Sequence, residues 1–436
     1  MKNLSVFQVT LLAIFSAFAV SGVLIFALVI GGNSGNKIGP VVVWGTLDAS
    51  PINVALRQAA EDDPRLAQVS YEQKDPVLFA NALTEALAGG AGPDIFLLRQ
   101  DYAMRDTPKA RIIPYEFISQ TEFKNTFVEA AAPYLIPEGI LGIPLSIDPM
   151  VMYWNRDLLS SAGYAEPPKY WDEIADLVGR VVKKDENGTI RKAAVAFGEY
   201  QNVDYAKDIL ALLILQAGGS ITQRDATGHV VPSLAVRTTG PQQATESALR
   251  FFTEFADPSK VDYSWNRSLP SSRAAFAAGD LALYFGYASE HAGITRTNPN
   301  LNYAVAPIPQ RRKDAASHTP DITIARVYAL TTSRTARNPQ SAITTASIVG
   351  GKSVSQAIST ALGIPSARRD ILAAPAQDED EIFRREALVA RSWIDPEPDK
   401  TATIFRAMIE GVTTGAARLT EAIGRASQEL AQVLGQ

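Results

Sequence analysis

Few residues in this sequence have the type and spacing that metal binding or covalent catalysis requires. The three histidines, His229, His291 and His318, lie far apart and lack the spacing of zinc ligands. The chain has no cysteine, which excludes disulfides, thiolate metal sites, cysteine nucleophiles and the lipid-carrying cysteine of a bacterial lipoprotein. The sequence contains no Gly-x-Ser-x-Gly motif, and no histidine is placed to suggest a Ser–His pair. We therefore expect neither a metal site nor a catalytic residue.

Two further segments carry weak motifs that helix ends explain better. Residues 346–353 match a relaxed P-loop, but Asn338-Pro339 begins a helix pattern for which Gly350 is a suitable C-terminal stop. The acidic run at 378–381 could bind a hard cation, yet carboxylates are also typical of the first turn of a helix. A carboxylate pair for acid–base catalysis stays open among 46 acidic residues, although the sequence singles out no pair.

The length and composition are those of a globular protein with more than one domain. The chain has 436 residues, of which 46% are hydrophobic and 20% charged. At roughly 100–200 residues per domain, this length predicts two or three domains. The net charge of −5 gives no support for binding a phosphate backbone, so we expect no nucleic-acid partner.

The first forty residues predict a membrane anchor. No charged residue lies between Lys2 and Lys37, and residues 11–30 are almost all apolar. Twenty residues in a helix span about 30 Å, the thickness of a bilayer core. A signal peptide cleaved after residues 17–19 is the alternative, but the apolar run continues well beyond that point. We expect an uncleaved single-pass helix in the cell membrane with a cytoplasmic N-terminus, a flexible leash up to residue 36, and an extracellular or periplasmic body.

The body alternates predicted strands and helices. Short β-branched or apolar runs at 41–44, 69–71 and 95–98 are separated by helical patterns that begin near residue 51 and residue 78. This βαβαβ order predicts an α/β fold with a parallel sheet covered by helices on both faces. Further strands are predicted at 143–145, 150–154, 281–285 and 303–306, and the last third is helical.

Several segments together resemble the solute-binding proteins of ABC importers, in the maltose-binding-like family. Residues 142–148 followed by 151–158 are similar to that family's signature at its first crossover between lobes. Residues 274–286 and 303–309 are similar to two later family segments, and the resemblance keeps its order from about residue 41 to residue 434. Each segment alone is weak, whereas the combination is specific.

The resemblance implies a two-lobed periplasmic-binding-protein-like fold of type II, here preceded by the N-terminal transmembrane helix. Lobe one would hold residues 40–147 and 310–355, and lobe two residues 149–308 and 356–436. A small-molecule ligand would bind between the lobes and favour the closed form, which the importer's membrane subunits would recognise. The resemblance implies a monomer that binds non-covalently and needs no cofactor.

Candidate ligand-binding residues follow from the rule that ligands lie beyond the carboxyl ends of strands, together with the resemblance. They are Trp44, Thr46, Asp48, Arg99, Asp101, Asp148, Glu199, Tyr200, Tyr287 and Phe405. Tyr287 and Phe405 stand where sugar-binding relatives carry stacking aromatics. Arg99 departs from a purely neutral-sugar site, since it could pair with Asp101 or hold an anionic group of the ligand.

These residue types suit a carbohydrate. Aromatic rings stack on the C–H faces of sugars, and carboxylates accept hydrogen bonds from their hydroxyls. The sequence therefore predicts a membrane-anchored solute-binding protein that delivers a carbohydrate to an ABC importer and is not an enzyme. A cell-surface hydrolase with a carboxylate pair in its cleft, and a sensor or adhesin without transport, remain the alternatives.

Overall fold

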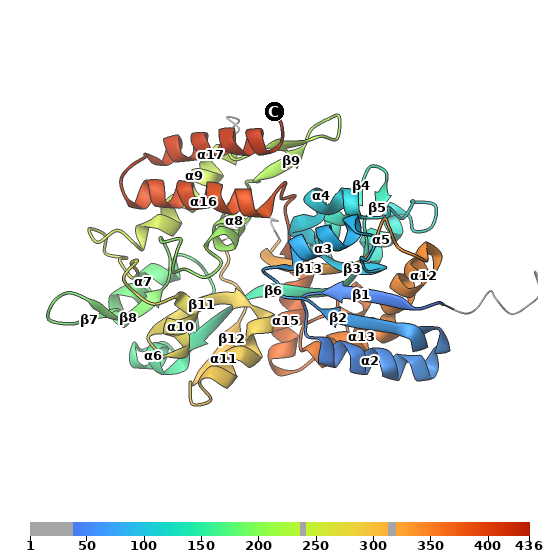
Figure 1. The fold of residues 1–436 in the computed structure, drawn as a ribbon. Coiled ribbons are helices and arrows are strands. Elements are labelled where there is room, and N and C mark those ends of the chain that lie inside the picture. Colours follow the sequence, from blue (N-terminus) through green and yellow to red (C-terminus); the bar gives the residue numbers. More distant parts are fainter. Residues whose placement is uncertain (1–37, 236–240, 313–319) are drawn as a thin grey trace, which may run out of the picture.

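The computed structural model describes residues 38–235, 241–312 and 320–436. The predicted anchor and leash lie outside these residues. Among the described helices, none combines the length and the apolar character needed to cross a bilayer. Figure 1 shows two lobes, placed side by side and joined through a central sheet.

Within the described residues, ten strands form one sheet that runs through both lobes. Its order is β2-β1-β3-β13-β6-β11-β8-β7, with β12 also paired to β6 and β14 to β13. The strands are β1 (Val41–Gly45), β2 (Val69–Gln73), β3 (Ile95–Arg99), β6 (Ile143–Asn155), β7 (Lys183–Lys184), β8 (Ile190–Val195), β11 (Leu281–Tyr287), β12 (Tyr303–Ala306), β13 (Thr323–Thr332) and β14 (Ala390–Arg391). Two small antiparallel pairs lie apart from it: β4 (Leu135–Ile136) with β5 (Gly139–Ile140), and β9 (Thr222–Arg224) with β10 (Val230–Pro232).

Strand β6 crosses from one lobe to the other. Its first half pairs antiparallel with β13, and its second half pairs antiparallel with β11 and β12. The buried hydrophobic side chains of the described residues fall into two clusters, and Ile147 belongs to one while Met150 belongs to the other. Each lobe therefore has its own hydrophobic core, and the boundary within β6 lies near Pro149.

Lobe one contains the predicted parallel arrangement. β1 pairs in parallel with both β2 and β3, which confirms the βαβαβ prediction. Helices α2 (Ala49–Asp62) and α3 (Phe79–Ala88) connect these strands. The further helices of this lobe are α4 (Ala103–Asp106), α5 (Gln120–Thr126), α12 (Pro339–Val349), α13 (Lys352–Leu362) and α14 (Arg369–Leu372), with 3-10 turns η2 (Pro64–Gln68), η3 (Gln100–Tyr102), η4 (Thr107–Lys109) and η5 (Glu129–Tyr134).

Lobe two is built around β8, β11, β12 and the second half of β6. Its helices are α6 (Arg156–Ser161), α7 (Glu173–Val181), α8 (Ala206–Gln216), α9 (Pro241–Glu254), α10 (Ser272–Ala277), α11 (His291–Thr297), α16 (Pro398–Thr413) and α17 (Leu419–Val433), with the turn η6 (Ala288–Glu290). The strands predicted at 281–285 and 303–306 and the C-terminal helices are confirmed.

The helix-end interpretations of the two weak motifs are also confirmed. Gly350 caps the C-terminus of α12 through an N–H to the Ala346 carbonyl, so a helix directly precedes this point where a P-loop would need a strand. The acidic run forms the first turn of α15 (Asp378–Val389). The lobe boundary predicted at residue 355 stays a prediction. In the structure Ile358, Ala367 and Leu372, which lie beyond it, pack in the core of lobe one.

Side chains of lobe one hold the crossing strand β13 by its backbone. The amide of Gln100 donates to the Ala325 carbonyl at 3.1 Å and accepts from the Val327 N–H at 2.7 Å. The buried Tyr134 hydroxyl lies 2.6 Å from the Leu98 carbonyl and 2.8 Å from the Val327 carbonyl. These contacts satisfy backbone groups at the point where the chain passes between lobes.

Helix α15 packs behind the crossing strands and touches both cores. In Figure 1 it lies below β6, whereas α8 and α16 lie above it. Phe383 belongs to the core of lobe two and Ala387 to that of lobe one. Between them, Glu386 is 2% exposed and accepts a hydrogen bond from the Ile308 N–H at 3.3 Å. Burial raises the pKa of Glu386 to about 8, although the Ile308 N–H and Arg385 oppose this shift.

We predict that Glu386 makes stability fall as the pH rises from about 5 to about 9. The folded chain holds this proton up to about pH 8, whereas the unfolded chain releases it near 4.5. Glu386→Gln keeps an acceptor for the Ile308 N–H but does not titrate. Its unfolding free energy relative to the wild type should therefore increase by on the order of 4 kcal/mol between pH 5 and pH 9.

Urea denaturation at both pH values measures this difference. The matched control is Glu381→Gln on the exposed first turn of the same helix, which makes the same chemical change outside the core. A pH-independent difference for Glu386→Gln would contradict the assignment of the raised pKa.

Candidate ligand-binding site

The two lobes meet above the crossing strands in a small polar space, which we call the seam. It has a cavity of about 20 Å³, enough for about one water molecule and too small for a sugar ring. The residues that line it come from both lobes and from β13. They are Gln100, Asp101, Lys207, Asp208, Tyr287, Ile324, Ala325, Arg326, Ser392, Trp393 and Asp395.

Lobe one contributes an ion pair at the end of β3, between Arg99 and Asp101. The Arg99 guanidinium donates two hydrogen bonds to Asp101, each 2.6 Å long. Burial favours the neutral form of Asp101, but the adjacent Arg99 charge outweighs burial and holds the pKa of this carboxyl below its usual range. The pair is held in one geometry, as bidentate arginine–carboxylate pairs are. Of the two roles considered for Arg99, the structure shows the pairing with Asp101.

Lobe two contributes a second charge pair that is deeper. Lys207 on α8 lies 2.6 Å from Asp395 and 2.7 Å from the Thr401 hydroxyl. The Asp395 side chain is 1% exposed. Burial raises the pKa of Asp395 to about 6, and the Lys207 charge limits that rise. Asp395 is therefore largely ionised at neutral pH because a lysine accompanies it.

The crossing strands add Asp148 and Arg326, which are register partners on β6 and β13. Asp148 is 2% exposed and accepts hydrogen bonds from the Ser289 N–H at 2.9 Å and the Ser289 hydroxyl at 2.6 Å. Burial raises its pKa, and the Ser289 donors oppose that rise. The Arg326 guanidinium lies 3.9 Å from the ring centre of Tyr287.

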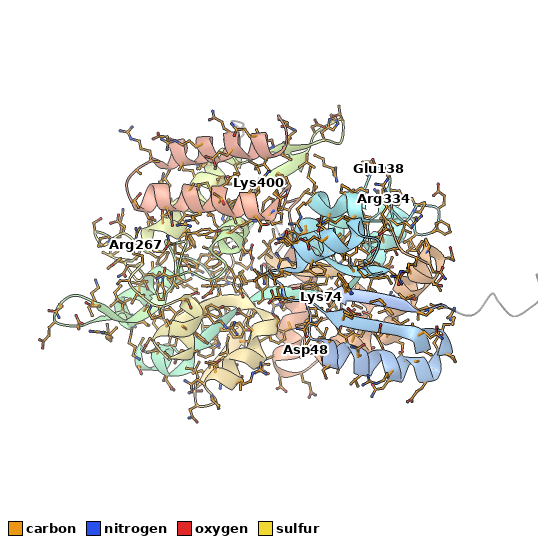
Figure 2. All side chains as sticks on the ribbon, in the orientation of Figure 1. Asp48, Lys74, Glu138, Arg267, Arg334 and Lys400 are labelled. Carbon is orange, nitrogen blue, oxygen red and sulfur yellow. The ribbon has the colours of Figure 1, made fainter. Side chains whose placement is uncertain are left out.

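Six predicted residues take other positions. Trp44 lies on β1, and the Lys74 ammonium after β2 is 3.8 Å from its ring centre. Thr46 is half-buried after β1, and the exposed Asp48 caps α2 by accepting from the Ser50 N–H. Figure 2 shows Asp48 and Lys74 on lobe one, on the side facing lobe two. Among the described residues, no hydrogen bond, ion pair or ring contact joins Trp44, Thr46 or Asp48 to the lining of the seam.

Three predicted residues of lobe two also lie outside the lining of the seam. Glu199 is 7% exposed and binds Arg267 at 3.3 Å, and Figure 2 places Arg267 on the side of lobe two remote from lobe one. Tyr200 is half-buried, and burial raises its pKa to about 12. Phe405 is buried in the core of lobe two, where it stacks on Trp393 with 6.2 Å between ring centres. Trp393, not Phe405, lines the seam.

The structure thus brings Asp101 and Tyr287 into the lining, with Arg99 and Asp148 beside it. Sequence reasoning missed Lys207, Asp208, Arg326, Trp393 and Asp395. A signal existed for Arg326, because it interrupts the apolar run of β13 as a single charged residue. None existed for the others, which lie on helices or irregular segments whose orientation depends on the whole fold.

A contact between the lobes lies beside the seam. Arg105 on α4 lies 3.6 Å from Glu397 and 3.8 Å from Asp399, at the start of α16. Both distances exceed hydrogen-bond length, the Asp399 side chain is 81% exposed, and the Arg105 guanidinium makes its hydrogen bonds to Asp106 instead. The lobes are therefore in contact in this structure, but these pairs hold them together weakly.

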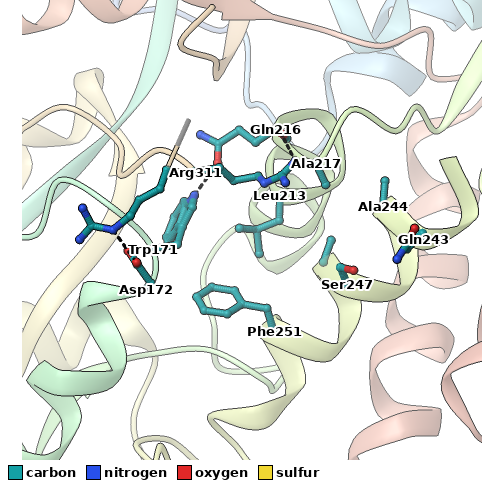
Figure 3. Close-up of a pocket in the computed structure, with 12 residues that line it drawn as sticks. Trp171, Asp172, Leu213, Gln216, Ala217, Gln243, Ala244, Ser247, Phe251 and Arg311 are labelled. Carbon is teal, nitrogen blue, oxygen red and sulfur yellow. Dashed lines mark hydrogen bonds and ion pairs between the residues drawn. The ribbon is translucent and has the colours of Figure 1, made fainter. Parts of the chain in front are cut away.

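A larger pocket lies within lobe two alone. It has a volume of about 640 Å³ between α8 and α9, with Trp171, Phe251 and Leu213 among its lining residues, as Figure 3 shows. Arg312 pairs with Asp172 at 2.6 Å, and Arg311 donates to the Gln216 carbonyl at the end of α8. A ligand here would not contact lobe one, so it would not couple the two lobes.

The sequence matches a known protein family over most of its length. The family described as bacterial extracellular solute-binding protein matches residues 58–384. A binding protein of Brucella abortus is 23% identical over 155 residues, which are 35% of this chain and 38% of that relative. The chain therefore aligns with well under half of that relative's length. The chain belongs to the extracellular solute-binding family, which confirms the predicted resemblance.

Solved structures share the two-lobed fold. A cyclo/maltodextrin-binding protein complexed with maltotetraose superposes with a TM-score of 0.72 at 15% identity, covering 92% of this chain and 98% of that one. A cyclic α-maltosyl-1,6-maltose-binding protein of Arthrobacter globiformis gives 0.72 at 15% identity, covering 91% and 99%. The predicted two-lobed α/β fold is confirmed for the body, whereas these comparisons do not bear on the N-terminal anchor.

We predict that Lys207→Met destabilises the fold in a pH-dependent way. At pH 8 the variant leaves Asp395 buried without its cation, which costs about 3–5 kcal/mol. At pH 5 the cost should be smaller, because Asp395 is largely protonated below its pKa of about 6. Urea denaturation at both pH values tests this, with Lys400→Met on the exposed face of α16 as the control. An equal loss at both pH values would refute the proposed coupling of Lys207 to Asp395.

Proposed function

We propose that this chain is the solute-binding receptor of an ABC importer and that its solute is a carbohydrate held in the seam. The family membership supports a binding role outside the cytoplasm. The ligands bound in the structural neighbours, maltotetraose among them, support a saccharide. The observation that carries the proposal is the seam itself, where charged and aromatic side chains of both lobes converge on one polar space.

The carboxylates of the seam favour binding over catalysis. Asp101 is held by Arg99, and Asp395 by Lys207. Asp148 is held by Ser289, and Asp208 accepts from the Tyr287 hydroxyl at 2.7 Å. Fixed carboxylates with partly free lone pairs are good acceptors for sugar hydroxyls. The pKa values of Asp101 and Asp395 are shifted in opposite directions, but each carboxylate is ion-paired with its own cation, and the matched family is one of binding proteins. We therefore favour the receptor over a hydrolase.

The size of the seam requires the lobes to separate before a ligand enters. A cavity of about 20 Å³ does not admit a sugar ring, and the lobes meet through weak ion pairs beside it. A ligand that contacts both lobes stabilises the closed arrangement by its differential affinity for it. Closure around the solute would present both lobes to the importer's membrane subunits. A receptor used for sensing or adhesion would close in the same way without those subunits.

The apolar segment 11–30 supports a tether for the receptor. It is long enough to span a bilayer core, and it precedes a Gly/Ser/Asn-rich stretch up to residue 36. The body would then lie close to the outer face of the cell membrane, and it would act as a monomer without a cofactor. A tethered receptor is available to its importer at high local concentration.

We predict that at least one saccharide raises the melting temperature of the purified chain. The probes are maltodextrins, ketohexoses, uronates and polyols in differential scanning fluorimetry. A ligand at 100 times its Kd adds about 2.7 kcal/mol to the unfolding free energy, which shifts the melting temperature by a few degrees. Asp101→Asn should lose most of this shift, and the exposed Asp176→Asn should keep it. Absence of any shift, or release of hydrolysis products from the bound saccharide, would contradict the receptor.

We predict that the full chain stays in the membrane fraction after an alkaline carbonate wash, whereas a chain that lacks residues 2–36 is released. The reason is the hydrophobic burial of a twenty-residue apolar helix. Intact mass of the membrane-extracted protein should show that residues 1–30 are present. A mass that corresponds to cleavage after Ala19 would refute the uncleaved anchor.

A further inference from the structure

Arg326 occupies a position in the seam that a buried strand rarely gives to a charged residue. It lies in the crossing strand β13, where nine of the ten residues are buried. Its register partner on β6 is Asp148, and paired residues of neighbouring strands project to the same face of a sheet. Arg326 therefore projects from the hinge region into the space between the lobes, and it lines the seam cavity.

Aromatic rings of lobe two hold the guanidinium in place. Its central carbon lies 3.9 Å from the ring centre of Tyr287 and 4.8 Å from that of Tyr205. The two rings meet edge to face, with 4.9 Å between their centres. Tyr205 adopts φ of +62°, a conformation that costs a bulky residue energy and is concentrated at functional sites. The faces of the guanidinium are thus engaged, whereas its N–H donors lie in its plane.

The N–H donors of the Arg326 guanidinium make no hydrogen bond to a described residue. The contact with Asp208 is a long ion pair of 3.6 Å, and the structure gives no hydrogen bond from this guanidinium to any described residue. Arg99 in the same seam donates two bonds of 2.6 Å, and Lys207 has three oxygen partners. Arg326 is 23% exposed at its side chain. A fixed fork of free donors beside a binding cavity is suited to a pair of acceptor oxygens.

We propose that Arg326 is the specificity-determining residue of the seam and selects a saccharide with two adjacent acceptor oxygens, either a vicinal diol or a carboxylate. This inference rests on the proposed function. Arg326 also covers the face of Tyr287 on which a sugar ring would stack. The ligand therefore meets the edge of the guanidinium. Trp393 is the other aromatic residue of the lining and is half-exposed, with Phe405 stacked on its ring and the Lys207 ammonium 5.4 Å from its ring centre.

Calorimetric titration of the full chain with maltotriose and with trigalacturonate tests the proposal. Arg326→Gln should lose affinity by about 10- to 100-fold for the bound probe, because two charge-assisted hydrogen bonds are lost. Arg326→Lys keeps the charge but not the planar fork, so it should restore only part of that loss. The control is Arg296→Gln, which replaces an exposed arginine on α11. It should bind within about 2-fold of the wild type, since Arg296 does not line the seam.

The two probes separate the two sources of acceptor oxygens. A loss confined to trigalacturonate that shrinks with added salt identifies a carboxylate, and a salt-insensitive loss with maltotriose identifies a diol. Unchanged or tighter binding by Arg326→Gln, with an unchanged thermal melt, overturns the proposal, and tighter binding would show that Arg326 only blocks Tyr287. A wild-type chain that binds neither these probes nor any other saccharide overturns the proposed function, and this inference with it.

Discussion

Two hydrophobic cores that share one pair of antiparallel strands set the constraint on which the rest of this molecule depends. β6 changes core within two residues, from Ile147 to Met150. Since neither core extends across the junction, the surfaces that the lobes turn toward each other are free to be polar. The backbone at the junction is satisfied by Gln100 and Tyr134, and helix α15 contributes Phe383 to one core and Ala387 to the other.

The polar seam is a consequence of that arrangement, and two of its carboxylates are each paired with a cation. Arg99 pairs with Asp101, whose side chain is 22% exposed. Lys207 pairs with Asp395, whose side chain is 1% exposed, and this cation keeps the buried carboxylate charged at neutral pH. Arg326 differs because aromatic faces hold it and, among the described residues, its guanidinium makes only a long ion pair with Asp208 and no hydrogen bond. Paired charges fix the shape of the site, and the unpaired donors are the part of it that a ligand completes.

Much of the fold could be predicted from the sequence because its signals are local. The β-branched runs and the glycines that follow helices gave β1, β2, β3 and the end of α12 at Gly350. The crossing at β6 came from a family resemblance over consecutive residues. The site could be predicted only in part, since its contacts join distant residues: Asp148 meets Ser289 and Gln100 meets Ala325, 141 and 225 positions away. Residue type alone did not distinguish Phe405 in the core from Trp393 at the seam.

The place where a solute binds decides whether the seam is the ligand site. A crystal structure of the chain with a saccharide that stabilises it should show the ligand between the lobes, in contact with Asp101 of lobe one and Trp393, and with the edge of the Arg326 guanidinium. A saccharide found instead in the pocket between α8 and α9, touching lobe two alone, would contradict the account.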